Sequence, residues 1–247
     1  MEEIKKILSA QNISFMQPFT NWGEIEIKTH HLPANANKFA TLVFVECYPS
    51  NEIKAKNIKI IDHHGPQSHK PASLLQTCRL LGVKPSLRQK IIASIDSDFL
   101  KETIKKFPRR KKLIINIWES GYKKRFKSKH EWLEFTSKCK HLWSRAKSTP
   151  PSIKKYAVVW DSPPSATYLS ALADLEGWKS LIIKASPETT RPASMLFQGD
   201  RNVVRFLASR KIPFSYHGRG YFGCKLPPRQ LIDLISAYLV KIKAWKQ

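Results

Sequence analysis

Three consecutive residues, Asp62, His63 and His64, carry side chains that bind metal ions or phosphate. Residues 58–61 before them are mostly β-branched and predict a short strand, and the Gly-Pro pair that follows favours a turn. The triplet is therefore expected at the carboxyl end of a strand, where ligands bind in an open α/β sheet. One carboxylate beside two imidazoles suits Mn, Fe or Zn better than Ca.

Further carboxylates lie at the ends of the elements around this triplet. The predicted elements are strands at 41–46 and 58–61 and helices at 72–81 and 86–98. The first strand ends in Glu46, and the last helix ends with Asp96 and Asp98. Either of these two Asp residues could complete the set, and each is as well suited to a cap or a turn. The result is an ordered series of metal-binding groups.

In this order the groups resemble the DHH phosphoesterase superfamily, whose members hold two divalent metals with acids and histidines delivered in the same sequence. The second half of the chain is similar to the associated DHHA1 domain, which has strands, helices and a glycine-rich turn in a fixed order. The corresponding elements here are strands at 156–160, 181–183 and 193–197, helices at 165–176, 202–210 and 231–243, and a turn at 217–224.

The resemblance, which covers roughly residues 40–100 and 155–245, implies two α/β domains. Residues 1–148 are expected to form a truncated DHH-like domain with a parallel sheet and a basic helical part at its end. Residues 149–154 contain paired prolines and have the chemistry of an extended linker. Residues 155–247 are expected to form the DHHA1-like domain.

Several family residues are replaced in this chain. The first motif of the family is a His followed by two Asp, whereas the nearest segment here, residues 29–37, places Ala or Asn at the acidic positions. Neutral amides cannot supply the negative charge that holds two divalent cations close together. Glu46 stands where the family has Asp, and Tyr221 stands where the phosphate-binding His would be.

These replacements predict a retained scaffold without an intact catalytic set. The vestigial candidates are Glu46, Asp62, His63, His64, Asp96 and Asp98. If a metal is bound, the resemblance implies Asp62 with Asp96 or Asp98 as its ligands. An acid at a strand end can equally hold a loop by accepting backbone hydrogen bonds.

The chain is strongly basic, with 43 Lys and Arg against 19 Asp and Glu and a formal net charge of +24. Such an imbalance indicates a polyanionic partner. No segment approaches the roughly 18 apolar residues of a membrane span, and the first residues lack the pattern of a signal peptide. The four cysteines are dispersed, which favours reduced thiols. We expect a cytoplasmic, nucleoid-associated protein.

The positive charge is concentrated between residues 101 and 147, where sixteen Lys or Arg face four Glu and aromatic residues interleave. Cations neutralise phosphates, and aromatic faces stack bases of a single strand at about 1–3 kcal/mol each. However, Trp132, Phe135, Cys139 and Trp143 have the spacing of a buried helical stripe, and for them a core role is favoured. The nucleic-acid-binding candidates are Arg109, Arg110, Lys111, Lys112, Lys123, Lys124, Arg125, Lys127, Lys129, Arg219 and Tyr221.

Gly218, Gly220 and Gly223 surround Arg219 in the glycine-rich turn. Glycines let a backbone approach a phosphate closely, and the arginine would pair with its charge. An ordinary tight turn explains the same residues equally well.

Taken with the basic charge, the resemblance is strongest to a degenerate member of the RecJ-like branch, the compact archaeal counterparts of the cell-division-cycle subunit of the CMG helicase. It implies a DNA replication protein that binds single-stranded DNA without cutting it, needs no cofactor, and associates with GINS and the MCM helicase. One alternative is an enzyme that requires Mn or Mg, either a 5'-3' single-strand exonuclease or an oligonucleotide phosphodiesterase. Another is an RNA-binding module, because charge alone does not separate DNA from RNA.

Overall fold

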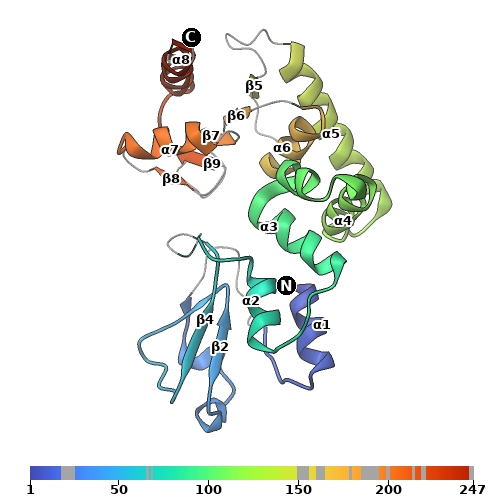
Figure 1. Ribbon diagram of the computed structural model, residues 1–247, viewed down its shortest axis with the longest axis vertical. Coiled ribbons are helices and arrows are strands. Elements are labelled where there is room, and N and C mark those ends of the chain that lie inside the picture. The colour runs from blue at the N-terminus through green and yellow to red at the C-terminus, as the bar shows by residue number, and fades with distance from the viewer. Residues whose placement is uncertain are drawn as a thin grey trace. The chain divides into compact units, whose positions relative to one another are not determined.

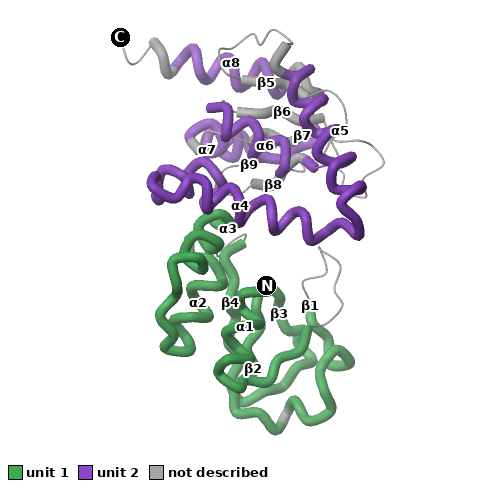
Figure 2. Tube along the Cα trace, turned by 90° about the vertical axis from the view of Figure 1, so that its right-hand side faces the viewer, with its two compact units in different colours: residues 1–97 green, residues 98–247 purple. Residues whose placement is uncertain are grey.

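Two units make up the chain. The computed structural model separates unit 1, residues 1–97, from unit 2, residues 98–247 (Figure 2). It describes residues 1–17, 26–64, 67, 69–148, 156–159, 165–177, 180–184, 195–198, 201–212, 215–217 and 221–244. Both units contain helices and strands, so the expected mixed α/β class is confirmed. None of the helices in these ranges is both long enough and apolar enough to cross a membrane.

Unit 1 is built from short strands and helices. Its elements are α1 (Glu2–Ala10), β1 (Glu26–Ile27), β2 (Leu42–Val45), β3 (Tyr48–Pro49), β4 (Ile58–Ile61), α2 (Ser73–Leu80) and the first part of α3 (Leu87–Lys106), with 3-10 turns at Thr29–His31 and Ala36–Lys38 (Figure 1). Strands β2 and β4 pair in parallel, and so do β1 and β3. The strands and helices predicted for the first hundred residues are thus confirmed.

Two small apolar cores hold these elements together. The first joins α1, α2 and α3 through Ile4, Ile7, Ala72, Leu74, Cys78 and Ala93. The second lies behind the strands and contains Ile27, Phe44 and Ile53. Ile53 belongs to the crossover between β2 and β4, the kind of connection that a parallel pair requires. Burial of Ile53 anchors this crossover to the core beside the strands.

Helix α3 is interrupted at Phe99, where the backbone is left-handed with a φ of 63°. The boundary between the units falls beside this kink, between Ser97 and Asp98. The sequence placed the domain boundary at 149–154 instead, a segment outside the described residues. The basic helices α4 (Lys111–Lys123) and α5 (Lys129–Ser148) were expected in the first domain but lie in unit 2.

An aromatic cluster explains why the basic helices lie in unit 2. Tyr168 of α6 (Ala166–Leu175) stacks on Trp118 of α4 with ring centroids 4.8 Å apart, and it meets Phe135 of α5 edge-on at 5.1 Å. Cys139 and Trp143 further along α5 are almost fully buried. The prediction that the stripe from Trp132 to Trp143 is core is therefore confirmed, and this packing ties α4 and α5 to α6.

The rest of unit 2 is a five-stranded sheet with further helices. The strands are β5 (Tyr156–Val159), β6 (Ser180–Lys184), β7 (Met195–Gln198), β8 (Tyr216–His217) and β9 (Tyr221–Cys224), in the spatial order β5-β6-β7-β9-β8. The remaining helical elements are a 3-10 turn at Pro108–Arg110, α7 (Arg201–Ser209) and α8 (Pro228–Ala244). Only the β5–β6 pair is parallel. A core of buried side chains from α7, β9 and α8 lies on this sheet.

The elements predicted for the second half are confirmed in order, with one correction. Gly223 was expected in a glycine-rich turn, but it lies within β9, opposite Leu196 of β7 and Tyr216 of β8. Because β9 pairs with β7 and with β8, Gly223 is part of the sheet and not of a turn. Gly218, Arg219 and Gly220 are outside the described residues.

Candidate functional site

The carboxyl ends of β2 and β4 meet in unit 1 (Figure 1). Val45 is opposite Ile61, the last residue of each strand, and the backbone N–H of Glu46 donates to the carbonyl of Ile61 at 2.8 Å. Glu46 has a left-handed backbone with a φ of 57°. The parallel pairing thus places Glu46 beside Asp62.

Asp62 is buried, with 3% of its surface exposed, and both carboxylate oxygens accept hydrogen bonds. One oxygen accepts from the backbone N–H groups of His63 and His64, at 2.7 and 3.0 Å, and from Nδ1 of His64 at 2.9 Å. The other accepts from the hydroxyl of Tyr48. Asp62 therefore fixes the turn that carries both histidines.

The contacts of Asp62 and Tyr48 determine which of the two side chains is charged. Burial alone would raise the pKa of Asp62, but the hydrogen bonds from Tyr48, His64 and His63 outweigh it, and the pKa lies below its usual value. The same hydrogen bond from Tyr48 raises the pKa of its phenol to about 12. Asp62 is charged and Tyr48 is neutral across the physiological range.

His63 is buried among three carboxylates. Its Nδ1 lies 3.0 Å from the hydroxyl of Ser73 and 3.8 Å from the carboxylate of Glu46. Its Nε2 makes no hydrogen bond of good geometry, although a carboxylate oxygen of Asp96 lies 3.2 Å away. Burial lowers the pKa of His63, but the charges of Asp96, Glu46 and Asp62 more than compensate, so the pKa is raised.

Glu46, His63 and His64 form a group that could hold one metal ion, since each offers a ligand atom and these atoms lie within 4.8 Å of one another. Two nitrogens and one carboxylate oxygen fit a transition metal such as Zn, Mn or Fe better than Mg or Ca. Asp62, the predicted ligand, accepts four hydrogen bonds, and the one from Nδ1 of His64 orients this ring in the way that outer carboxylates orient metal-binding histidines.

The structure distinguishes the two candidate acids of α3. Asp96 is in unit 1 beside His63, whereas Asp98 is in unit 2 and pairs with Lys106 at 2.9 Å. Asp96 is therefore the acid that accompanies the triplet. In the loop at residues 29–37, Asn35 is exposed and Ala36 is buried, and neither supplies a charged ligand.

Two residues of this site escaped the sequence analysis. Tyr48 follows Glu46 by two positions, and Ser73 begins α2 with a hydroxyl toward His63. The spacing of Glu46 and Tyr48 is that of ordinary strand alternation, so it does not indicate that Tyr48 contacts the site. A polar residue at the start of a helix predicts a cap, which hid the contact of Ser73 with the histidine.

The basic candidates of unit 2 lie in two clusters. The first, which we call the proximal cluster, consists of Arg109, Arg110, Lys111 and Lys112 at the 3-10 turn and the start of α4. The second, the distal cluster, consists of Lys123, Lys124, Arg125, Lys127 and Lys129, from the end of α4 to the start of α5. All nine side chains are exposed. Among the described residues none of them forms an ion pair.

The aromatic residues in and after the distal cluster are packed against other rings. Phe126, Trp132 and Phe135 contact one another with ring centroids 4.8 to 5.8 Å apart, and Phe135 also contacts Tyr168. No aromatic side chain between residues 107 and 143 is among the exposed large hydrophobic residues of the described ranges. Arg125 covers the face of Tyr122 at 4.8 Å. These rings are committed to the core, so the cations remain the available contacts.

The predicted phosphate site of the second half is only partly visible. Arg219 lies outside the described residues, and for Tyr221 only the backbone, in β9, is described. The predicted roles of both residues therefore stay predictions.

No model of a known protein family matches the sequence, and no curated protein matches it significantly. The resemblance to the DHH superfamily therefore rests on the order of the motifs.

Proposed function

We propose that this protein is a catalytically degenerate RecJ-like protein that holds single-stranded DNA on the basic surface of unit 2 without cutting it. The observation that carries this proposal is the exposure of nine cations between the 3-10 turn at Pro108–Arg110 and the start of α5, none of them paired with an acid among the described residues. Unpaired surface cations attract phosphates and gain free energy by releasing the counterions of the nucleic acid.

The absence of cleavage is inferred from the acids around β2 and β4. A two-metal phosphodiesterase site needs several anionic ligands, and here Asp62 is occupied by four hydrogen bonds. The first-motif acids are replaced by Ala and Asn. What remains suits one cation at most, held by Glu46, His63 and His64.

The association with GINS and the MCM helicase is part of the same proposal and comes from the resemblance alone. The same holds for the two-domain DHH and DHHA1 architecture, which the order of elements in each half supports. Mixing the purified protein with purified GINS and MCM and following co-elution in gel filtration tests the association. Separate elution at low salt would contradict it.

The central experiment combines binding and cleavage. An end-labelled single-stranded DNA oligomer is incubated with the protein, with Mn or Mg present, and both retention and fragment length are measured. We expect binding that weakens steeply with salt and leaves the oligomer intact. Glu46→Gln is the matched variant, because the side chain of Glu46 accepts no hydrogen bond from any of the residues that the structure describes, and its nearest basic partner is His63 at 3.8 Å. Shortened fragments from the wild type that Glu46→Gln abolishes would refute the degenerate site.

A metal-dependent phosphodiesterase is the second candidate, and the proximity of Glu46, His63 and His64 favours it. A divalent cation in that group would supply Lewis-acid activation of water and charge neutralisation at phosphorus. The residues themselves would hold the ion, with Asp62 and Tyr48 fixing His64. Isothermal titration with Mn or Zn, in the wild type and in Glu46→Gln, measures whether the group binds an ion at all.

Oligomers that differ only in their sugar distinguish an RNA-binding role from a DNA-binding role. Competition between ribose and deoxyribose oligomers of the same sequence gives equal affinities if only phosphates are contacted. A clear preference for the ribose oligomer would indicate contacts to the 2'-hydroxyl and would replace the DNA proposal.

A further inference from the structure

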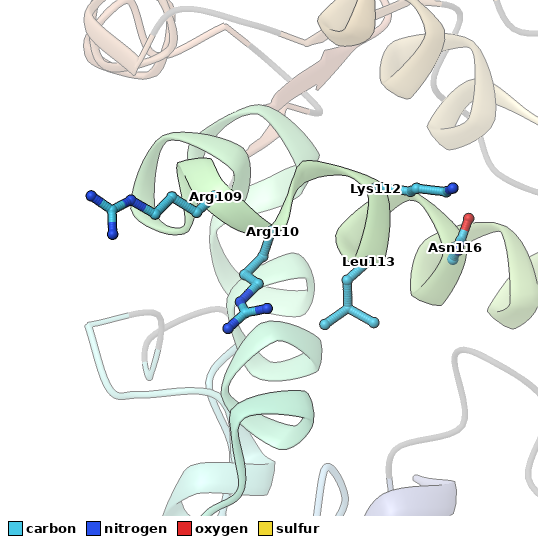
Figure 3. Close-up of a pocket in the computed structure, with 5 residues that line it drawn as sticks. All are labelled: Arg109, Arg110, Lys112, Leu113 and Asn116. Atoms are coloured by element: carbon cyan, nitrogen blue, oxygen red, sulfur yellow. The ribbon is translucent and has the colours of Figure 1, made fainter.

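The proximal cluster surrounds a depression of about 320 Å³ (Figure 3). Its lining residues are Arg109, Arg110, Lys112, Leu113 and Asn116. Lys112 and Asn116 are one helical turn apart on α4 and project in the same direction, and Arg110 projects beside Leu113. Arg109 and Lys112 extend to opposite sides in Figure 3, so the three cations, the aliphatic side chain and the amide line a wide, open depression.

The chemistry of this lining differs from that of the distal cluster. The side-chain amide of Asn116 has no hydrogen-bond partner in the part of the chain that the structure describes. Leu113 is half-buried, so it offers an apolar surface at the floor of the depression. The distal cluster has its neighbouring rings packed internally, and Arg125 is stacked on Tyr122. Only the proximal cluster therefore combines charge with groups that could contact a base or a sugar.

From this we infer that the depression is the primary contact for the nucleic-acid strand and takes a single nucleotide unit. The guanidinium and ammonium groups of Arg109, Arg110 and Lys112 neutralise the phosphodiester. Leu113 contacts the sugar or base, and the amide of Asn116 hydrogen-bonds a base edge. The distal cluster then attracts the strand by charge alone. This inference rests on the proposed function, because it assigns the place where the proposed ligand binds.

Two variants of equal charge test the inference. Arg109→Gln/Arg110→Gln/Lys112→Gln removes the cations of the depression, and Lys123→Gln/Lys124→Gln/Arg125→Gln removes the same charge from the distal cluster. Affinity for a fluorescent single-stranded DNA oligomer is measured by anisotropy over a series of salt concentrations. The first variant is expected to bind about tenfold more weakly than the second. Its salt dependence should also lose about two units of log–log slope.

A substitution that changes no charge tests whether the amide of Asn116 contacts the nucleic-acid strand. Asn116→Ala should lower the affinity about threefold with an unchanged salt slope, because no cation is removed. Ser120→Ala, one turn further along α4, is the control and should bind like the wild type. In the wild type, the side-chain amide signal of Asn116 in a ¹H–¹⁵N spectrum should shift on addition of a trinucleotide.

The possible outcomes separate the inference from the proposed function. No binding of DNA by the wild type would overturn both. Binding by the wild type, with equal losses in the two triple variants and no effect of Asn116→Ala, would overturn only the inference and leave a diffuse basic surface. A larger loss in the distal variant would place the primary contact at the distal cluster instead.

Discussion

The candidate metal site of unit 1 and the basic surface of unit 2 differ in where their charged side chains lie. In unit 1 the charged groups are inside: Asp62 is buried and its oxygens are filled by Tyr48 and the two histidines, and His63 lies among carboxylates. In unit 2 the nine cations of the proximal and distal clusters are exposed and repel one another, and within the described ranges none of them forms an ion pair with an acid. Charged groups that are paired inside the protein stabilise its fold. Surface cations that have no paired acid lower their free energy by binding an anionic ligand.

The largest effect is expected from Asp62→Ala. The substitution leaves the Tyr48 hydroxyl and the histidine N–H groups without their buried acceptor, so unit 1 should lose about 3–5 kcal/mol of stability. Urea denaturation followed by circular dichroism measures the change. Glu46→Gln should remain within about 1 kcal/mol of the wild type. Equal stability of the two variants would show that Asp62 does not hold the site together.

The surface of unit 2 should respond in binding and not in stability. Lys123→Glu/Lys124→Glu/Arg125→Glu is expected to weaken DNA binding by about 2 kcal/mol, or roughly thirtyfold, for all sequences alike, with a flatter salt dependence. Thermal unfolding should be unchanged or slightly improved, since like charges are removed. Unaltered affinity would remove the distal cluster from the proposed function.

A second acid sharpens the comparison between the units. Burial raises the pKa of Asp174, in α6, from 3.8 to about 6, and the nearby Lys101 only partly opposes this. Since the folded state holds this proton more tightly than the unfolded state, stability should fall as the pH rises from about 4 to about 6. Asp174→Asn should flatten this part of the profile and add on the order of 1–2 kcal/mol at pH 7.

Asp62 has the opposite sign. Its pKa is lowered in the folded state, so its contribution to stability is present above its ordinary pKa and is lost as the pH falls through the folded value. Unfolding transitions recorded between pH 3 and pH 8 for the wild type and for Asp174→Asn resolve the two effects. A profile that the Asn substitution leaves unchanged would contradict the assignment for Asp174.

The smallest effect is expected from Tyr48→Phe. It removes one of the four hydrogen bonds to Asp62 and leaves the ring in place, so the loss should be about 1 kcal/mol. Because His64 keeps its own bond to Asp62, metal binding measured by titration should change little. A loss as large as that of Asp62→Ala would mean that Tyr48 is the main support of the turn.

Sequence patterns predicted the framework well where apolar periodicity is strong. The strands that end at Glu46 and Asp62 and the buried stripe from Trp132 to Trp143 follow from spacing, and the structure has them. Patterns of spacing carry no information on tertiary contacts, however. The choice between Asp96 and Asp98 depends on where α3 is kinked, and the contact of Tyr48 with Asp62 depends on how a crossover folds back.

The placement of the basic helices shows the same limit. Their charge indicated a polyanionic ligand, but the unit to which they belong is decided by Trp118 and Phe135 packing against Tyr168, a residue distant in sequence. The aromatic residues near them have other rings as partners, which residue spacing alone does not show. A residue type predicts what a side chain can do, and the packing decides whether it is free to do it.

Helix α4 has 13 residues, so it separates the proximal and distal clusters by about 20 Å. This distance is more than twice the screening length of about 8 Å at physiological salt, so a ligand at one end does not sense the other through solvent. At a stacked rise of 3.4 Å per residue of one strand, about six nucleotides are needed to reach from end to end. The length of α4 thus sets the shortest oligomer that can contact both clusters. Affinity for single-stranded DNA should rise abruptly once an oligomer exceeds that length.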